Sequence, residues 1–165
     1  MNFVSNPELM AEHLLDTYWR GRAMPVDPAE IALRLNIECR VTTLPRDIAG
    51  VLLYEKSDVS QLVAEVKDSP LRRRFVHACL LGLLLEKNAG LPNAPDSGKQ
   101  VLRREAISCA ENKAVMPYFK RFALELLMPK SVLNKVYRKR PASLLMGDFC
   151  APQEAIKARC EFFGQ

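Results

Sequence analysis

The sequence predicts an α+β fold in which helices pack on a small antiparallel three-stranded sheet. Three strand-like runs lie together between residues 37 and 67, and helical patterns precede and follow them. Strands that are grouped in the chain, and do not alternate with helices, are typical of α+β proteins. The length of 165 residues suits one compact domain, or one domain with a small appendage.

The N-terminal part of the chain predicts two helices. Residues 7–20 place apolar side chains near a 3.6-residue spacing, which is the period of an amphipathic helix. Asp27 then resembles an N-cap, with Pro28 at the first helical position and Glu30 three residues after the cap. A short helix should follow and end near Leu35.

The predicted strands cover residues 37–43, 50–55 and 61–67. The first run alternates apolar and polar residues, which is the pattern of a half-buried strand. The polar turn at 56–58 separates the second run from the third. We therefore expect an antiparallel meander.

Helices dominate the rest of the predicted structure. Ser69-Pro70 opens a strong helical run over residues 71–87, and a polar loop follows at 92–98. Proline and glycine then divide the remaining chain into shorter helical segments. These are predicted over residues 101–113, 117–127, 131–138 and 153–163, with another short helix between Pro141 and Pro152.

Composition excludes several classes of protein. The five cysteines are widely spaced and form no C-x-x-C pair, which argues against a disulfide scaffold and a zinc ribbon. No apolar stretch reaches the roughly 20 residues of a membrane span, and the N-terminus does not resemble a secretory signal. The net charge of +5 permits contact with nucleic acid without requiring it. We therefore expect a cytoplasmic protein.

Two segments carry a family resemblance. Residues 74–85 read RFVHACLLGLLL, and residues 122–129 read FALELLMP. Two further segments support the same resemblance and follow the order of the family's motifs. They are PVDP at 25–28, followed by Ile31-Ala32, and FCAPQEA at 149–155. In these residues the chain resembles the ImmA/IrrE family of zinc metallopeptidases. Members of that family carry an RF-x-x-A-H-E-L-G-H-L-L helix and a later F-A-x-E-L-L-M-P segment.

The resemblance implies both an architecture and an activity. It implies a zincin-like core in a metallopeptidase-like domain over residues 1–129, with a C-terminal helical segment, residues 130–165, packed on it. In H-E-x-x-H, two histidines one helical turn apart bind zinc, and the glutamate polarises the attacking water. Active members act on helix-turn-helix repressors, often of phages or other mobile elements, and relieve repression by promoting cleavage.

This chain departs from the family at each position that carries the chemistry. Aligned on the shared apolar residues, the first histidine position is Cys79, the glutamate position is Leu80 and the second histidine position is Leu83. The later acidic ligand falls at or near Met116. A catalytic zinc site needs about three protein ligands, and leucine cannot accept a proton. The sequence therefore predicts a pseudoprotease without a metal, a cofactor or catalytic residues.

The expected function is regulation by binding. The resemblance implies that the scaffold still docks a helix-turn-helix repressor and relieves repression without proteolysis, as an antirepressor of a phage or mobile element would. The filled cleft near Leu80, Leu83 and Met116, and the C-terminal helices, are the expected contact surfaces. A homo-oligomer is also compatible with the sequence.

Three alternatives stay open at this point. The chain could be an enzyme with an altered site that contains Cys79, with His77 nearby. It could also be a structural subunit of a larger assembly. Finally, it could bind nucleic acid or a partner through basic residues, since positive runs suit a phosphate backbone. The residues concerned are Arg72, Arg73, Arg138, Lys139 and Arg140.

Overall fold

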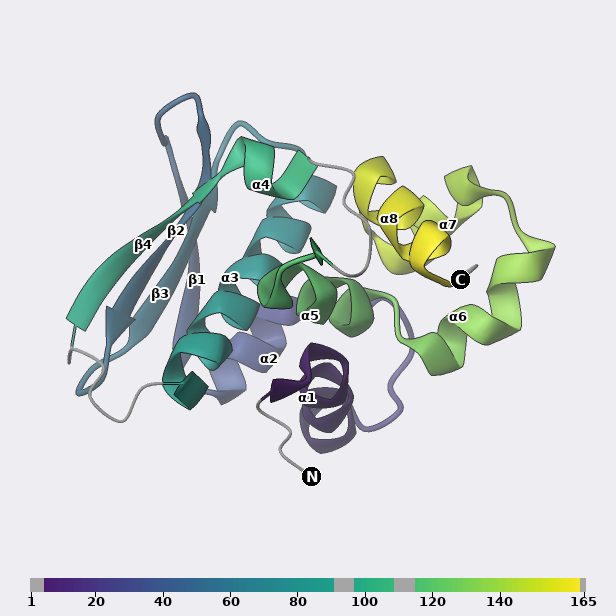
Figure 1. Ribbon diagram of the computed structural model, residues 1–165, viewed down its shortest axis with the longest axis horizontal. Helices are drawn as coiled ribbons and strands as arrows, with labels where there is room; N and C mark the ends of the chain where they lie inside the picture. Colours follow the sequence, from purple (N-terminus) through teal and green to yellow (C-terminus); the bar gives the residue numbers. More distant parts are fainter. Residues whose placement is uncertain (1–4, 91–96, 109–114, 164–165) are drawn as a thin grey trace.

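The computed structural model describes residues 5–90, 97–108 and 115–163. It confirms the α+β class: a mixed sheet lies on one side of the molecule, and helices pack against one of its faces (Figure 1). None of the helices in these ranges combines the length and the apolar content needed to cross a membrane.

The described sheet has four strands, so the prediction of a three-stranded antiparallel meander is wrong. The strands are β1 (Ile37–Thr42), β2 (Ile48–Glu55), β3 (Ser60–Glu65) and β4 (Ser97–Arg103), in the order β1-β3-β2-β4. β2 is antiparallel to both β3 and β4, whereas β1 runs parallel to β3. The hairpin of β2 and β3 was expected, but the insertion of β3 between β1 and β2 was not.

Burial explains this strand order. β3 is buried at nearly every position and takes an interior place beside β2, whereas β1 and β4 are largely exposed and form the two edges. In β4 only Leu102 is buried. This strand occupies residues predicted as a polar loop and as the start of a helix, and the observed helix α4 covers only Arg104–Ser108. The rest of the predicted helix, residues 109–113, lies outside the described ranges.

The N-terminal helices follow the predicted signals. Helix α1 (Pro7–Leu14) continues into a wider π-helical turn, η2 (Leu15–Trp19). The Asn6 side chain accepts a hydrogen bond from the Leu9 amide at the start of α1. Asp27 caps α2 (Pro28–Arg34) in the same way, by accepting from the Ala29 amide at 3.0 Å. Short polar caps therefore fix where both helices begin.

Helix α3 (Pro70–Gly90) is the centre of the fold and packs between the sheet and α5 (Tyr118–Leu127). Two glycines allow this close packing. A Cβ on Gly50 of β2 would lie 2.7 Å from Val76 Cγ1 of α3. A Cβ on Gly82 of α3 would lie 2.9 Å from Phe119 Cα of α5. Real Cβ contacts are longer, so the sheet, α3 and α5 approach each other closely at these glycines.

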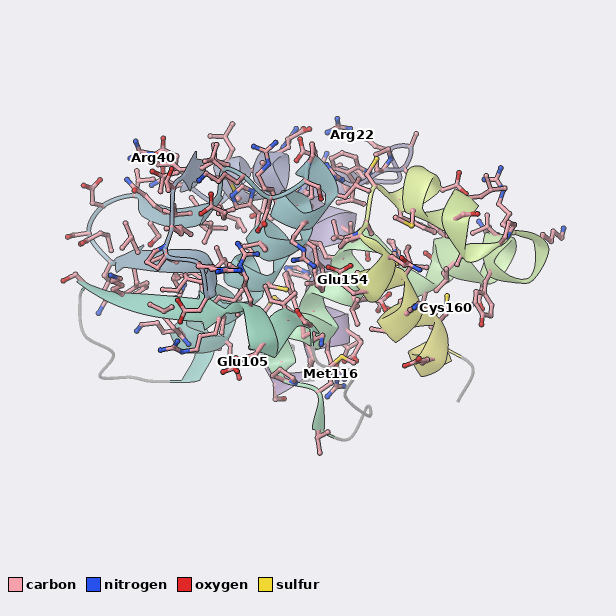
Figure 2. All side chains as sticks on the ribbon, turned by 90° about the horizontal axis from the view of Figure 1, so that it is seen from above. Arg22, Arg40, Glu105, Met116, Glu154 and Cys160 are labelled. Carbon is pink, nitrogen blue, oxygen red and sulfur yellow. The ribbon has the colours of Figure 1, made fainter. Side chains whose placement is uncertain are left out.

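The C-terminal helices are joined to α3 and α5 by arginines. These helices are α6 (Lys130–Val136), the short 3-10 turn η4 (Tyr137–Lys139), α7 (Ala142–Phe149) and α8 (Gln153–Phe163). Arg72 Nε of α3 donates to Glu154 of α8 at 3.1 Å, and Figure 2 shows Glu154 where these helices meet. Arg159 of α8 forms a buried ion pair with Glu125 of α5. The division at residue 129 into a domain and a helical segment stays a prediction.

Candidate functional site

The positions that would carry zinc chemistry lie inside the hydrophobic core. Cys79 and Leu80 are completely buried on α3, and Leu83 is 8% exposed. Met116, just before α5, is 5% exposed (Figure 2). Apolar side chains and one thiol therefore occupy the place where the family resemblance puts ligands and a general base.

The helix contacts leave little space around these positions. Leu80 Cδ1 lies 3.0 Å from the point where a Cβ on Gly50 would stand, so Leu80 packs against the sheet. On the other side of α3, Gly82 faces the backbone of Phe119 and the ring of Phe122. These side chains fill the region between the sheet, α3 and α5, and this is what makes the α3 face a packed core.

The Cys79 thiol is poorly suited to nucleophilic chemistry. Its burial raises its pKa above the ordinary value of 9.0, and the nearby charge of Lys120 lowers it only in part. A thiol becomes reactive when it is deprotonated and accessible, and Cys79 is neither near neutral pH.

His77 serves the packing of α3 against the sheet. Its Nε2 donates to the backbone carbonyl of Arg40 on β1 at 3.0 Å, and its side chain is buried. Burial lowers the pKa of His77, so the ring is neutral near pH 7. Cys79, two residues later, is influenced by Lys120 of α5 instead. The structure therefore directs the two side chains to different neighbours and does not bring them together as an acid–base pair.

The described residues contain no group of three or more histidine, cysteine or acidic side chains that could hold a metal ion. Within these ranges, the structure offers no alternative ligand set in place of the missing H-E-x-x-H residues.

The predicted basic contact residues belong to two segments of the chain, the start of α3 and the region of η4. Arg72 pairs with Glu154 and Arg140 pairs with Asp148, so both belong to intramolecular ion pairs. Arg73 is half-buried on α3, whereas Lys139 is exposed in η4. Arg138 also lies in η4, but its side chain is outside the described part of the structure.

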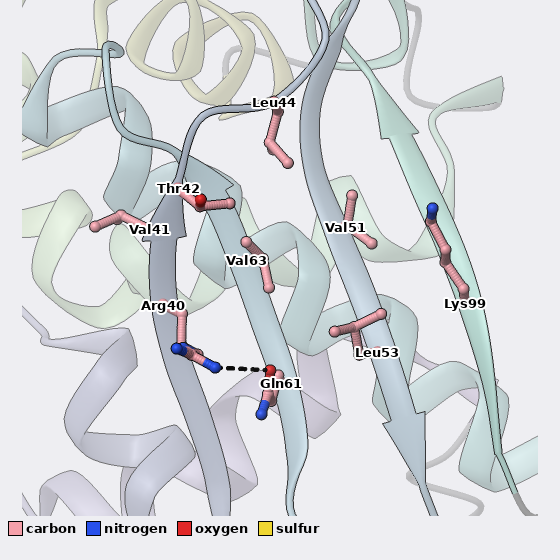
Figure 3. A pocket seen from close by; sticks show the side chains of 9 residues that line it. All are labelled: Arg40, Val41, Thr42, Leu44, Val51, Leu53, Gln61, Val63 and Lys99. Atoms are coloured by element: carbon pink, nitrogen blue, oxygen red, sulfur yellow. Dashed lines mark hydrogen bonds between the residues drawn. The ribbon is translucent and has the colours of Figure 1, made fainter.

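A pocket of about 400 Å³ lies on the opposite side of the sheet from α3, and the sequence reasoning missed it. Its floor is formed by Val51 and Leu53 of β2 and Val63 of β3 (Figure 3). A signal was present in the sequence. β2 contains a continuous apolar run, and such runs are typical of strands that are covered on both faces.

The rim of this pocket is polar and positively charged. Arg40 of β1 and Lys99 of β4 line it from the two edges of the sheet, and Gln61 of β3 lies beside Arg40 (Figure 3). Arg40 Nη1 donates weakly to Gln61 Oε1 at 3.4 Å. No aspartate or glutamate is among the described residues that line the pocket. The arrangement can bind an apolar group that carries negative charge at its sides.

One end of the pocket is shaped by a fixed loop. Leu44, in the connection from β1 to β2, lines the pocket, and its amide donates to the buried Glu65 carboxylate at 2.6 Å. The Lys67 amide donates to the other oxygen of this carboxylate at 2.9 Å. These two backbone hydrogen bonds lower the pKa of Glu65. The carboxylate therefore stays ionised at neutral pH and holds the loop in place.

A comparison with models of known protein families finds no match, and a comparison with curated proteins finds none either. The ImmA/IrrE resemblance is therefore carried by the motifs of the chain itself.

Proposed function

We propose that this protein is a non-catalytic regulator that binds a helix-turn-helix repressor and relieves repression without proteolysis. The observation that carries the proposal is the burial of four positions on and beside α3. Cys79, Leu80, Leu83 and Met116 stand where the family resemblance puts ligands and base, and all four are buried in the core. A scaffold of a repressor-directed protease that has lost its chemistry can still act by binding.

Binding alone is a sufficient mechanism for such a regulator. A partner that binds one state of a repressor more tightly than another shifts the population by that difference in affinity. Occupying the dimerisation or DNA-binding surface of the repressor would have this effect in the cytoplasm, where the proposal places both proteins. Neither zinc nor a nucleophile is required.

The cleft near Leu80, Leu83 and Met116 was one expected contact surface. These three side chains are packed in the core and are themselves at most 8% exposed. The C-terminal helices stay available. Leu144 of α7 is 51% exposed, and Lys139 in the preceding turn is exposed.

Two alternatives find less support in the geometry. An enzyme that uses Cys79 would need an accessible thiolate, and this thiol is buried with a raised pKa. A helix-turn-helix formed by α7 and α8 would need α8 to enter a DNA groove. Instead, Ile156 and Arg159 of α8 are buried, and Glu154 is paired with Arg72.

Affinity capture of the tagged protein from its native cells, with intact-mass analysis of the captured proteins, tests the proposal. We expect a full-length helix-turn-helix repressor, which must then form a complex of two intact chains when both proteins are purified and mixed. Leu144→Asp is a surface variant for this assay, with Leu33→Asp as a control because Leu33 of α2 is also exposed. Specific fragments of a repressor, or a capture without any repressor, would contradict binding without cleavage.

A further inference from the structure

The open face of the sheet has the character of an uncovered interface. A sheet with one solvated face ordinarily carries apolar residues on the packed face and polar residues on the other. Here Val51, Leu53, Val63 and Val101 point away from α3, because they alternate with the buried Leu52, Leu62 and Leu102 in the strand register. Leu53 and Val101 are partly exposed, whereas Val51 and Val63 are 7% and 8% exposed at the floor of the pocket. No described helix covers them (Figure 1).

Two cations flank this apolar strip, one on each edge strand of the sheet. Leu53 pairs in register with Gln61 on one side and with Lys99 on the other. Arg40 reaches to Gln61, whereas the Lys99 side chain extends along the sheet toward the level of Val51 (Figure 3). Of the described residues that line the pocket, none is acidic, and the Glu65 carboxylate already accepts from two backbone amides.

The separation of the two edge strands suits a helix. Arg40 and Lys99 stand on the two edge strands of the order β1-β3-β2-β4, and three inter-strand steps of about 4.8 Å separate those strands by roughly 14 Å. An α-helix with its side chains is about 10–12 Å wide. A helix that lies along the strands would therefore place its two flanks beside the two cations.

We propose that the open face of the sheet, formed by Val51, Leu53 and Val63 between Arg40 and Lys99, binds an amphipathic helix of a partner protein that carries carboxylates on both sides of an apolar stripe. The apolar stripe fills the 400 Å³ pocket, and the carboxylates meet the two cations. Leu44 limits the helix at one end, since its loop is fixed by Glu65. This inference does not require the partner to be a repressor.

The test uses two labelled helical peptides of about 18 residues, long enough for about five turns. Both carry the same leucine stripe. One has glutamates on both flanks of the stripe, and the other has lysines there. Fluorescence anisotropy with the full chain should give binding of the glutamate peptide at least about tenfold tighter than that of the lysine peptide. The preference should weaken as salt is raised.

Charge reversal at the rim should reverse this preference. The double variant Arg40→Glu/Lys99→Glu should bind the lysine peptide more tightly than the glutamate peptide. Lys130→Glu/Lys157→Glu is the matched control, since it changes the net charge equally at exposed positions of α6 and α8. It should keep the preference of the unmodified chain. Leu53→Asp should abolish binding of the glutamate peptide while the unfolding transition stays cooperative.

Several outcomes would overturn the proposal. These are the absence of binding by the glutamate peptide, equal binding of the two peptides, or an unchanged preference in the rim variant. Light scattering gives a further check, because a dimer of the chain that Leu53→Asp dissociates would assign this face to a second copy and not to a partner helix.

Discussion

The two faces of the sheet are built from the same strands but differ in what covers them. On one face, Leu52, Leu62 and Leu102 are buried under α3 and the helices behind it. On the other, Leu53 and Val101 are partly exposed beside a pocket, while Val51 and Val63 at its floor are 7% and 8% exposed. The face where the family resemblance places chemistry is closed, whereas the face without any expected role is open, apolar and positively charged at its rim.

This difference teaches where a function can reside. A closed and well-packed core can stabilise a fold, but it cannot exchange ligands with solvent. An exposed apolar strip costs solubility unless something covers it, and such patches often mark sites of interaction. If the face under α3 is rigid and the open face tolerates change, substitutions on the two faces should lower the free energy of unfolding by different amounts. The substitutions below follow in order of decreasing expected effect.

Loss of the buried Arg159 guanidinium should cause the largest destabilisation. Arg159→Met leaves the Glu125 carboxylate, whose side chain is 3% exposed, without its cation. We expect a loss of about 3–5 kcal/mol in the free energy of unfolding, measured with urea. Glu125→Gln/Arg159→Met should recover most of this loss, because the amide still accepts from the Lys130 backbone. If Arg159→Met alone were as stable as the unmodified chain, the ion pair with Glu125 would not anchor α8.

Truncation of two adjacent leucines compares the two faces directly. Leu52→Ala empties a fully buried position under α3 and should cost about 2–5 kcal/mol. Leu53→Ala removes a partly exposed side chain from the open face and should cost about 1 kcal/mol or less. Chemical unfolding of both variants gives the two values. Equal costs would mean that the open face is packed as firmly as the closed one.

A single methyl group should distinguish a closed position from an open one. Gly82→Ala places a Cβ 2.9 Å from the Phe119 backbone, so α3 and α5 must move apart at a cost of about 1–3 kcal/mol. Gly147→Ala is the control in α7, where a Cβ meets nothing within 4 Å. It should leave stability unchanged or raise it by about 0.5–1 kcal/mol, because alanine favours a helix over glycine. Thermal unfolding measures both changes. A Gly82→Ala variant that is as stable as the Gly147→Ala variant would contradict the close helix contact.

The smallest effect concerns pH. Burial lowers the pKa of His77 below its ordinary 6.5, so the unfolded chain takes up the proton first as the pH falls. The contribution of neutral His77 to stability is therefore complete above pH 6.5 and is lost as the pH falls through the folded-state pKa. Between about pH 7.5 and about pH 5, the unmodified chain should lose more stability than His77→Gln. Equal losses would place the ring in solvent.

The sequence predicted the parts of the fold that local patterns determine. The apolar run of α3, the cap at Asp27 and the proline that follows α5 are local signals, and the helices form where they indicate. Strand order is not local, because β3 lies beside β1 through contacts distant in sequence. β4 was missed since only Leu102 of that strand is buried, which leaves too weak an alternation to recognise.

The candidate site also has one part that local sequence predicts and one part that depends on contacts between distant residues. The prediction that no zinc ligands remain rests on Cys79, Leu80 and Leu83, and the structure adds that these three positions are buried. The apolar run of β2 indicates apolar residues on both faces of that strand, but it does not locate the pocket, which combines side chains from four strands whose order was unknown. Arg40 and Lys99 are 59 positions apart in the sequence (99 minus 40) and become opposite rims only when the sheet is assembled.

Methyl-resolved NMR of the full chain with the glutamate peptide tests the contrast between the two faces most directly. We predict that the methyl signals of Val51, Leu53 and Val63 shift as the peptide is added, while those of Leu80 and Leu83 stay in place. Shifts at Leu80 and Leu83 without shifts at the open face would contradict this assignment, because they would show that the α3 side opens to bind and that the sheet face does not.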